Sequence, residues 1–374
     1  MGGTGGDPRL VKLFLCGDVM TGRGIDQILP HPSEPTLYEP YVTSARAYVE
    51  LAERVSGPIA RPVDFPYVWG DVLAEMAEQA PDLRVINLET SITKSESPLS
   101  KGINYRMHPA NAGCLLAAGI DCCVLANNHV LDWGVEGLLE TLDTLSEAGI
   151  ATAGAGRTAD EAARPAVLEI AAGCRVLVFS LGSTTSGVPA GWAATKSRPG
   201  VNLVTDLSDR TASRIASEIL EYRREGDIVL VSVHWGENWG YEIPQAQRQF
   251  AHKIIDAGAA DLVHGHSSHH VKGMEVYGGH LILYGCGDFI TDYEGIGGHE
   301  EYRPGLVLAY FASVEAESGR LVRLEMVPLM SRLLRLERVG KKHAAAVRRI
   351  LNREGERLGT RFVSTARGAI ELRQ

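Results

Sequence analysis

Short apolar runs that end in polar residues recur along the chain, and they constrain the fold most strongly. The runs are rich in Val, Ile and Leu and are continuous rather than alternating, as in strands buried on both faces of a sheet. Helix-like segments lie between them at residues 135–149, 208–226 and 243–258. Because strand-like and helix-like segments alternate, the sequence predicts an α/β fold.

The 374 residues suffice for one large α/β domain or two smaller ones. We expect a flexible lead-in at 1–9 and a main domain at 10–330. A proline- and tyrosine-rich stretch at 28–66 is too long for a simple loop, so we expect an insertion that covers part of the surface or the site. Residues 331–374 read as a basic, helical C-terminal extension. We favour a solvated helix that closes the domain, and a basic docking face for a partner is the alternative.

The net charge of −9 argues against a general nucleic-acid binder. The first residues lack the pattern of a signal peptide, and no apolar run is long enough to span a bilayer. The six cysteines form no CxxC pair, which favours buried thiols in a reducing compartment. We therefore expect a soluble, cytoplasmic protein without nucleic-acid or membrane partners.

The polar ends of these runs predict one shared site. In open α/β sheets, ligands bind beyond the carboxyl ends of the strands. Five runs deliver polar side chains there, which include Asp18, Glu89, Asn127, Asn128, His129, His234 and His266. Carboxylate, amide and imidazole groups together suit divalent metal ions, and one carboxylate can bridge two cations about 3.5–4 Å apart.

The segment ADLVHGHSSHH at 260–270 holds four histidines. His264 and His266 are two residues apart, so both face one side of an extended strand and form a good chelating pair. His269 and His270 follow the strand, and we expect at most one of them to point inward. His269 is a candidate ligand or proton carrier, whereas His270 reads as a bystander.

Each of the other signals has a structural alternative. Asp18 in GDVM and Glu89 in NLET could simply cap the turns or segments that follow them. A lone histidine at a strand end, such as His234, is more often structural than catalytic. Asn128 and His129 directly after a buried strand are more specific, because such groups are costly to bury without partners.

The motifs GDVM, NLET, NNHVLDWG, HWG, DLVHGHSSH and YGCGDF resemble, in their order, the CapA/PgsA family, which is named for poly-γ-glutamate capsule synthesis. That family is similar to the calcineurin-like metallophosphoesterases. The resemblance covers residues 10–330, the main domain. It implies a four-layer α/β/β/α sandwich with a site for two divalent metal ions, which could be Mn, Mg, Ca, Fe or Zn.

The resemblance also implies residue roles. Asp18 would bind the first metal, Glu89 would bridge, and Asn128 and His234 would bind the second. His129 would be an acid or base, and His266, with His264 or His269, would complete the shells. Two departures put phosphoester hydrolysis in doubt: Met20 stands where the phosphoesterases have histidine, and Gly265–His269 is one residue longer than their Gly-His-x-His.

The preferred function is a metal-dependent peptide epimerase (an isomerase), similar to the soluble lasso-peptide epimerases of that family. His129 or His269 would move a proton at a Cα beside a metal-bound carbonyl or carboxylate of a peptide substrate. Arg106 would pair with a substrate carboxylate, and Trp235 and Trp239 would flank an apolar side chain.

Two alternatives stay open. One is a metal-dependent hydrolase of phosphoesters or amide bonds. The other is a non-catalytic component of poly-γ-glutamate synthesis.

Overall fold

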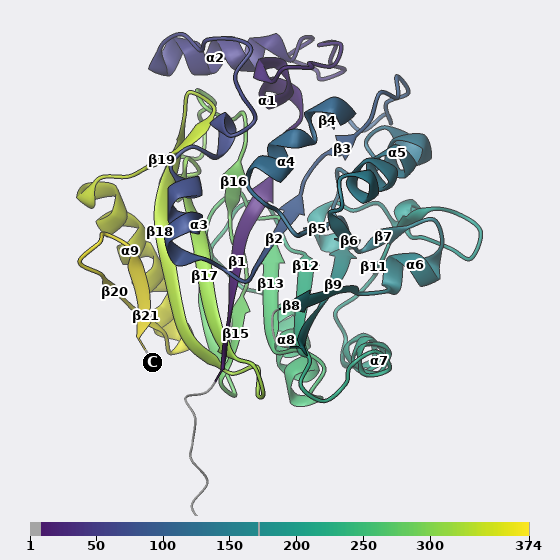
Figure 1. Cartoon of the computed structure of the whole chain (residues 1–374), viewed down its shortest axis with the longest axis vertical. Coiled ribbons are helices and arrows are strands. Elements are labelled where there is room, and N and C mark those ends of the chain that lie inside the picture. Colours follow the sequence, from purple (N-terminus) through teal and green to yellow (C-terminus); the bar gives the residue numbers. More distant parts are fainter. Residues whose placement is uncertain (1–8, 171–172, 374) are drawn as a thin grey trace, which may run out of the picture.

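Two β-sheets form the centre of the computed structural model, which describes residues 9–170 and 173–373 (Figure 1). The larger sheet has ten described strands in the order β20-β21-β18-β17-β1-β2-β5-β6, with β16 beside β1 and β19 beside β18. Their bounds are β1 (Leu10–Val19), β2 (Leu83–Leu88), β5 (Cys122–Val124), β6 (Ala151–Ala153), β16 (Asp288–Ile290), β17 (Leu306–Glu315), β18 (Leu321–Arg332), β19 (Arg335–Arg338), β20 (Arg361–Ser364) and β21 (Ile370–Arg373).

The smaller sheet has seven described strands in the order β11-β9-β12-β13-β15-β14, with β8 beside β9. They are β8 (Ala166–Ile170), β9 (Cys174–Ser183), β11 (Leu203–Val204), β12 (Ile228–His234), β13 (Leu262–His266), β14 (Met274–Tyr277) and β15 (His280–Leu283). Two short pairs complete the described strands: β3 (Ser91–Ile92) with β4 (Arg106–Met107), and β7 (Ala155–Gly156) with β10 (Gly200–Val201).

The helices lie around these sheets (Figure 1). They are α1 (Arg23–Ile28), α2 (Arg46–Ser56), α3 (Val72–Gln79), α4 (Gly113–Ala117), α5 (Gly134–Glu147), α6 (Ala159–Ala163), α7 (Asp209–Leu220), α8 (Gln245–Asp256) and α9 (Lys341–Gly355). The helices predicted at 135–149, 208–226 and 243–258 are confirmed as α5, α7 and α8. The predicted α/β class is confirmed as well.

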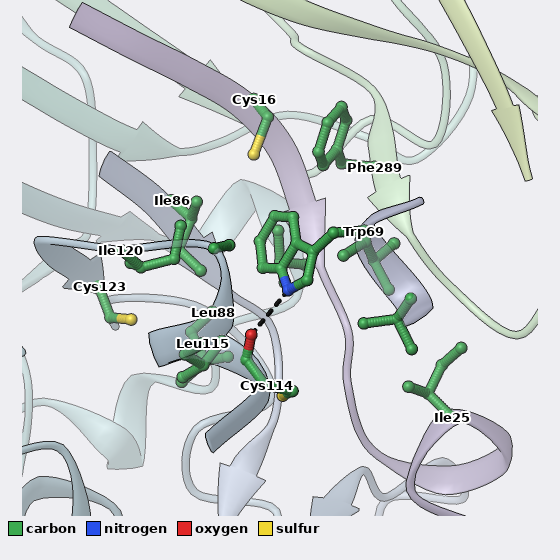
Figure 2. Close-up of a cluster of buried hydrophobic side chains, with 14 of the residues drawn as sticks. Cys16, Ile25, Trp69, Ile86, Leu88, Cys114, Leu115, Ile120, Cys123 and Phe289 are labelled. Atoms are coloured by element: carbon green, nitrogen blue, oxygen red, sulfur yellow. Dashed lines mark hydrogen bonds between the residues drawn. The ribbon is translucent and has the colours of Figure 1, made fainter. Parts of the chain in front are cut away.

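The core lies between and outside the two sheets. Leu15 of β1 and Leu230 of β12 belong to one buried cluster, so the sheets pack face to face. A second cluster joins the smaller sheet to α7 and α8, and a third covers the other face of the larger sheet. In that third cluster the Trp69 ring is fully buried, and its Nε1 donates a hydrogen bond to Cys114 O over 2.8 Å (Figure 2).

The two segments that break the strand–helix alternation have regular structure. The 28–66 stretch contains α2, whose Tyr48 lines the large pocket described below. The 331–374 segment holds α9 together with β19, β20 and β21, which extend the ten-stranded sheet. It is therefore more than a helical extension, because its strands are part of the main sheet.

Candidate metal centre

Strand register builds the site. In the larger sheet, Asp18 of β1 is the register partner of both Asn87 of β2 and Asp288 of β16. In the smaller sheet, His234 of β12 is the partner of His266 of β13. The carboxyl-terminal parts of the parallel strands β1, β2, β12 and β13 bring Asp18, Asn87, His234 and His266 to the site, whereas Asp288 reaches it from the first residue of β16.

Asp18, His234 and His266 form a buried donor cluster. One ligand atom from each lies within 4.8 Å of the others. His266 Nδ1 lies 3.9 Å from Asp18 Oδ1 and 2.7 Å from His234 Nδ1. A carboxylate with two imidazoles is a common donor set for divalent transition metals. The cluster supports a metal site, while the number and identity of the ions stay predictions.

Glu89 and Asn128 lie on the far side of His234. His234 Nε2 is 3.0 Å from Asn128 Oδ1 and 3.5 Å from Glu89 Oε1. Three of the residues predicted to surround the second metal thus lie together.

Asn87 was missed by the sequence reasoning. Its Nδ2 donates hydrogen bonds to Asp18 Oδ1 over 2.7 Å and to Glu89 Oε2. Its Oδ1 accepts from Asn127 Nδ2 over 3.0 Å. Asn87 therefore orients two carboxylates while Asn127 orients Asn87, and the position of Asn87 two residues before Glu89 is the signal that could have revealed it.

Asp288 was noted as the end of an apolar run but was not assigned a role. Its Oδ1 lies 2.9 Å from His269 Nδ1. Its Oδ2 is buried and has no hydrogen-bond partner among the described residues, although Asp288 lines the pocket. Burying an unpaired carboxylate oxygen is costly, so this oxygen fits a site that binds a cation.

The surroundings of the carboxyl groups disfavour their ionised forms. Burial, and next the charge of Asp288, raises the pKa of Asp18 to about 7. Burial and the charge of Asp18 raise the pKa of Glu89 well above its usual value. A bound divalent cation would remove this penalty, because it stabilises the ionised carboxylates.

The imidazoles have the opposite shift. Burial lowers the pKa of His234 and of His266 well below the usual value, followed by the effect of neighbouring histidines. Neutral imidazole is the form that binds metal ions. The two rings are therefore ready to act as ligands near neutral pH.

His264 lies apart from this cluster. Its Nε2 is 2.7 Å from Cys16 O and its Nδ1 is 3.1 Å from Ser232 Oγ. Ser232 Oγ is also 2.8 Å from His266 Nε2. Both ring nitrogens of His264 are thus engaged, so the structure places it behind His266 rather than in the predicted ligand set.

The other two histidines of the segment diverge. His269 lines the pocket and contacts Asp288. Burial lowers the pKa of His269, but the charge and hydrogen bond of Asp288 together with the charge of Asp18 outweigh burial, so the net shift is upward. His270 Nδ1 is 3.2 Å from Val271 O, and His270 does not line the pocket.

His129 forms a dyad with Asp132 beside the metal cluster. His129 Nδ1 is 2.7 Å from Asp132 Oδ2, and the His129 ring stacks on Tyr105 with centroids 4.0 Å apart. Lys101, a residue that sequence reasoning missed, donates from Nζ to Asp132 Oδ1 over 2.7 Å. Burial lowers the pKa of His129 to about 4 even though Asp132 opposes the shift.

A pocket of about 610 Å³ opens onto these residues. Ligand pockets are typically roughly 300–1,000 Å³. Its polar wall carries Asp18, Glu89, Lys101, Asn128, His129, His234, His269 and Asp288, and its apolar wall includes Ile103, Trp239, Ile296, Pro304 and Val307.

Of the three residues predicted to contact a substrate, one lines the pocket and two do not. Trp239 lines the pocket, where it stacks on His299 with centroids 3.8 Å apart. Arg106 lies outside it, because its guanidinium donates to Ser95 O and Glu34 O. Trp235 packs in the core and donates to Tyr284 O. The structure therefore corrects the placement of Arg106 and Trp235.

Fold and site together define an α/β protein with a buried cluster of candidate metal ligands beside a pocket. The family model described as "Bacterial capsule synthesis protein PGA_cap" matches residues 12–293. The chain belongs to this family, as the motif resemblance predicted.

Several named proteins are similar to the chain. Two Mycobacterium tuberculosis proteins (strains CDC 1551 / Oshkosh and ATCC 25618 / H37Rv) are 46% identical over 98% of this chain and 97% of their own length. Both are named "Probable polyglutamine synthesis accessory protein". The Bacillus subtilis "PGA biosynthesis protein CapA" is 29% identical over 76% of this chain and 64% of its own length.

The predicted peptide epimerase is wrong. The three relatives just described are named as synthesis accessory or biosynthesis proteins, and none of them is named as an isomerase or as a lasso-peptide enzyme. These names support the non-catalytic alternative. Within residues 9–170 and 173–373, no helix is long and apolar enough to cross a bilayer.

Proposed function

We propose that this chain is an accessory protein in the synthesis of a glutamate- or glutamine-based polymer, and that its pocket binds part of that polymer. The observation that carries the proposal is the 46% identity, over 98% of the chain, to proteins named for polyglutamine synthesis accessory function. The pocket supports it, because the pocket is large enough for a short stretch of a peptide-like chain. A peptide-like polymer therefore replaces the peptide substrate that the sequence suggested.

The metal centre would anchor that chain. Asp18, His234 and His266 would hold a divalent cation, with Asn87 orienting the carboxylate. When bound, the cation supplies a positive site for a carboxylate or carbonyl oxygen of the polymer. Glu89 and Asn128 stand ready for a second cation, and the two-ion site remains part of this proposal.

The residues around the cluster would orient the polymer. His269 is favoured in its protonated form by Asp288, so it can donate to a polymer carboxylate. The apolar wall with Trp239 and Ile296 would cover the methylene groups of glutamate side chains.

The four-layer sandwich that the family resemblance implies is also part of the proposal. Buried clusters between the two sheets and on both outer faces support a four-layer sandwich of the metallophosphoesterase type. In such an arrangement the site lies where the carboxyl ends of both parallel strand sets meet, as Asp18 and His234 do here.

Deleting the gene in its host and restoring variants tests the accessory role. We expect the deletion strain to lose the polymer, wild-type protein to restore it, and Asp18→Asn to fail. His31→Ala, which is exposed and outside the pocket lining, serves as the control and should restore the polymer. Normal polymer in the deletion strain would contradict the role, and release of monomers from the polymer by purified protein would contradict a non-catalytic one.

A further inference from the structure

The C-terminal segment carries a charge opposite to the rest of the chain. Residues 331–374 hold 12 Lys and Arg against 4 Asp and Glu, in a chain that totals 37 against 46. Residues 1–330 therefore hold 25 basic against 42 acidic residues. Ser331 is the one described residue of this segment that lines the pocket, and the matched family region ends at residue 293.

Helix α9 concentrates that charge on one face. Val347 and Leu351 face the core, where they pack with Phe362 of β20. Lys342, Arg349 and Arg353 are exposed, and their spacings of seven and four residues put them on one side of the helix. Lys341 is exposed beside them, so the cationic face is about 18 Å long at 1.5 Å per residue.

The charges on this face are largely unpaired. Lys341, Lys342 and Arg349 pair with no carboxylate among the described residues, whereas Arg353 contacts Glu354 at 2.5 Å. Like charges such as Arg349 and Arg353, four residues apart, destabilise a helix by a few tenths of a kcal/mol. An anionic ligand would relieve this repulsion.

The positive charge of Arg361 and Arg373 has a simpler explanation than ligand binding. They are exposed register partners on β20 and β21 at the edge of the ten-stranded sheet. Positive charge on an edge strand protects it from pairing with another chain. We therefore leave this pair out of the inferred surface.

Ring contacts connect α9 to the pocket. The Arg353 guanidinium lies 4.4 Å from the centroid of the Tyr241 ring. Tyr241 contacts Tyr302 with centroids 5.2 Å apart, and Tyr302 contacts the pocket residue Trp239 with centroids 5.4 Å apart. One extended ligand can thus reach from the pocket to α9 across aromatic rings.

We infer that the exposed face of α9, formed by Lys341, Lys342, Arg349 and Arg353, binds the polycarboxylate form of the polymer while another part of the same chain occupies the pocket. The polymer itself rests on the proposed function. Charge complementarity selects the ligand, because a glutamate polymer carries one negative charge per residue and a glutamine polymer carries none. Exposed Glu242 and Glu301 adjoin Tyr241 and Tyr302 in sequence, so the groups that attract the polymer's carboxylates lie on α9 and in the pocket rather than beside the rings between.

An anionic membrane fits this face less well. Membrane-bound helices insert large apolar side chains beside their basic residues. Residues 331–373 present no exposed large hydrophobic side chain, and the apolar side of α9 is buried against the sheet. The surface offers charge without an apolar anchor.

Binding of purified, metal-loaded full-length protein to poly-γ-glutamate tests the inference. The variant Lys341→Gln/Lys342→Gln/Arg349→Gln should weaken binding about tenfold at low salt, and the loss should shrink as salt screens the charges. The control Lys196→Gln/Arg210→Gln/Arg224→Gln removes three exposed cations elsewhere and should bind like wild type. Polyglutamine should bind both variants equally.

Equal poly-γ-glutamate affinity of the α9 variant and the control would overturn the inference. So would α9-dependent binding to phosphatidylserine vesicles that exceeds binding to the polymer. The proposed function has a separate readout: if the α9 variant binds poly-γ-glutamate weakly but the deletion strain makes normal polymer, the accessory role fails and the surface stands. If the deletion strain loses polymer but the α9 variant binds normally, the surface alone fails.

Discussion

Asn87 donates a hydrogen bond to Asp18 across two neighbouring parallel strands, with 2.7 Å between Nδ2 and Oδ1. The same nitrogen reaches Glu89, so one amide fixes the two carboxylates on either side of the candidate metal site. Asn87→Leu keeps the side-chain size but removes the donor. Because residues that orient ligands typically contribute 10–100-fold to metal affinity, we expect a loss of about tenfold or more in isothermal titration. Unchanged affinity in a folded Asn87→Leu protein would show that Asp18 needs no such support.

Metal binding should depend on pH through Asp18. Burial and Asp288 raise the pKa of Asp18 to about 7, so below that pH a proton competes with the cation. We expect metal affinity to fall about tenfold for each pH unit below 7 for one competing proton.

The raised pKa of Asp18 also determines how this residue makes folding stability depend on pH. A folded-state pKa above the unfolded one favours folding at low pH, and this contribution is lost as the pH rises through about 7. The buried histidines with lowered pKa values, such as His234 and His266, change stability in the opposite direction, so the contribution of Asp18 is read against Asp18→Asn. Between pH 6 and pH 8 the melting temperature of metal-free wild type should fall relative to that of metal-free Asp18→Asn. An equal difference between the two proteins at both pH values would contradict the shift.

Lys101 should tune the dyad of His129 and Asp132. Its ammonium contacts Asp132 and opposes a positive charge on His129, whose pKa is about 4 chiefly because of burial. In Lys101→Met the pKa of His129 should rise, which an NMR titration of the ring would report. Lys94→Met removes an exposed cation nearby in sequence and should leave His129 unchanged.

Trp69 should be a main support of the core beside the larger sheet. Its ring is fully buried, and Trp→Ala substitutions at such sites cost about 3–5 kcal/mol. Trp69→Phe keeps most of the ring but loses the bond to Cys114 O, so we expect a cost nearer 1 kcal/mol plus a smaller packing loss. Chemical denaturation measures the loss of unfolding free energy in Trp69→Ala and in Trp69→Phe. A larger loss for Trp69→Phe would contradict the prediction.

Strands and their polar ends could be predicted from the sequence because they depend on local pattern. Asp18, His234 and His266 each end or nearly end a continuous apolar run, and parallel strands bring such ends together. The roles of neighbours could not be predicted in the same way. His264 and His266 have equivalent spacing, and only the carbonyl of Cys16, delivered by the other sheet, distinguishes them.

Contacts between distant segments account for the other differences. Arg106 is turned from the pocket by Ser95 O and by Glu34 O, which lies 72 residues away. Asp288 enters the site only because β16 pairs with β1 in a register that no local pattern indicates. The function could not be predicted from the site residues alone, because their chemistry suits several reactions. The proposal of a role in polymer synthesis depends on the names of similar proteins.

The metal content of purified protein tests the central claim most directly. We predict one or two equivalents of a divalent metal per chain in wild type and in His343→Ala. We predict a large loss of metal in Asp18→Asn and His266→Ala, while circular dichroism shows that both variants remain folded. Two equivalents would support the second position at Glu89 and Asn128, and one would restrict the site to the Asp18 cluster. Equal metal content in wild type and His266→Ala would contradict the assignment of this cluster as the metal site.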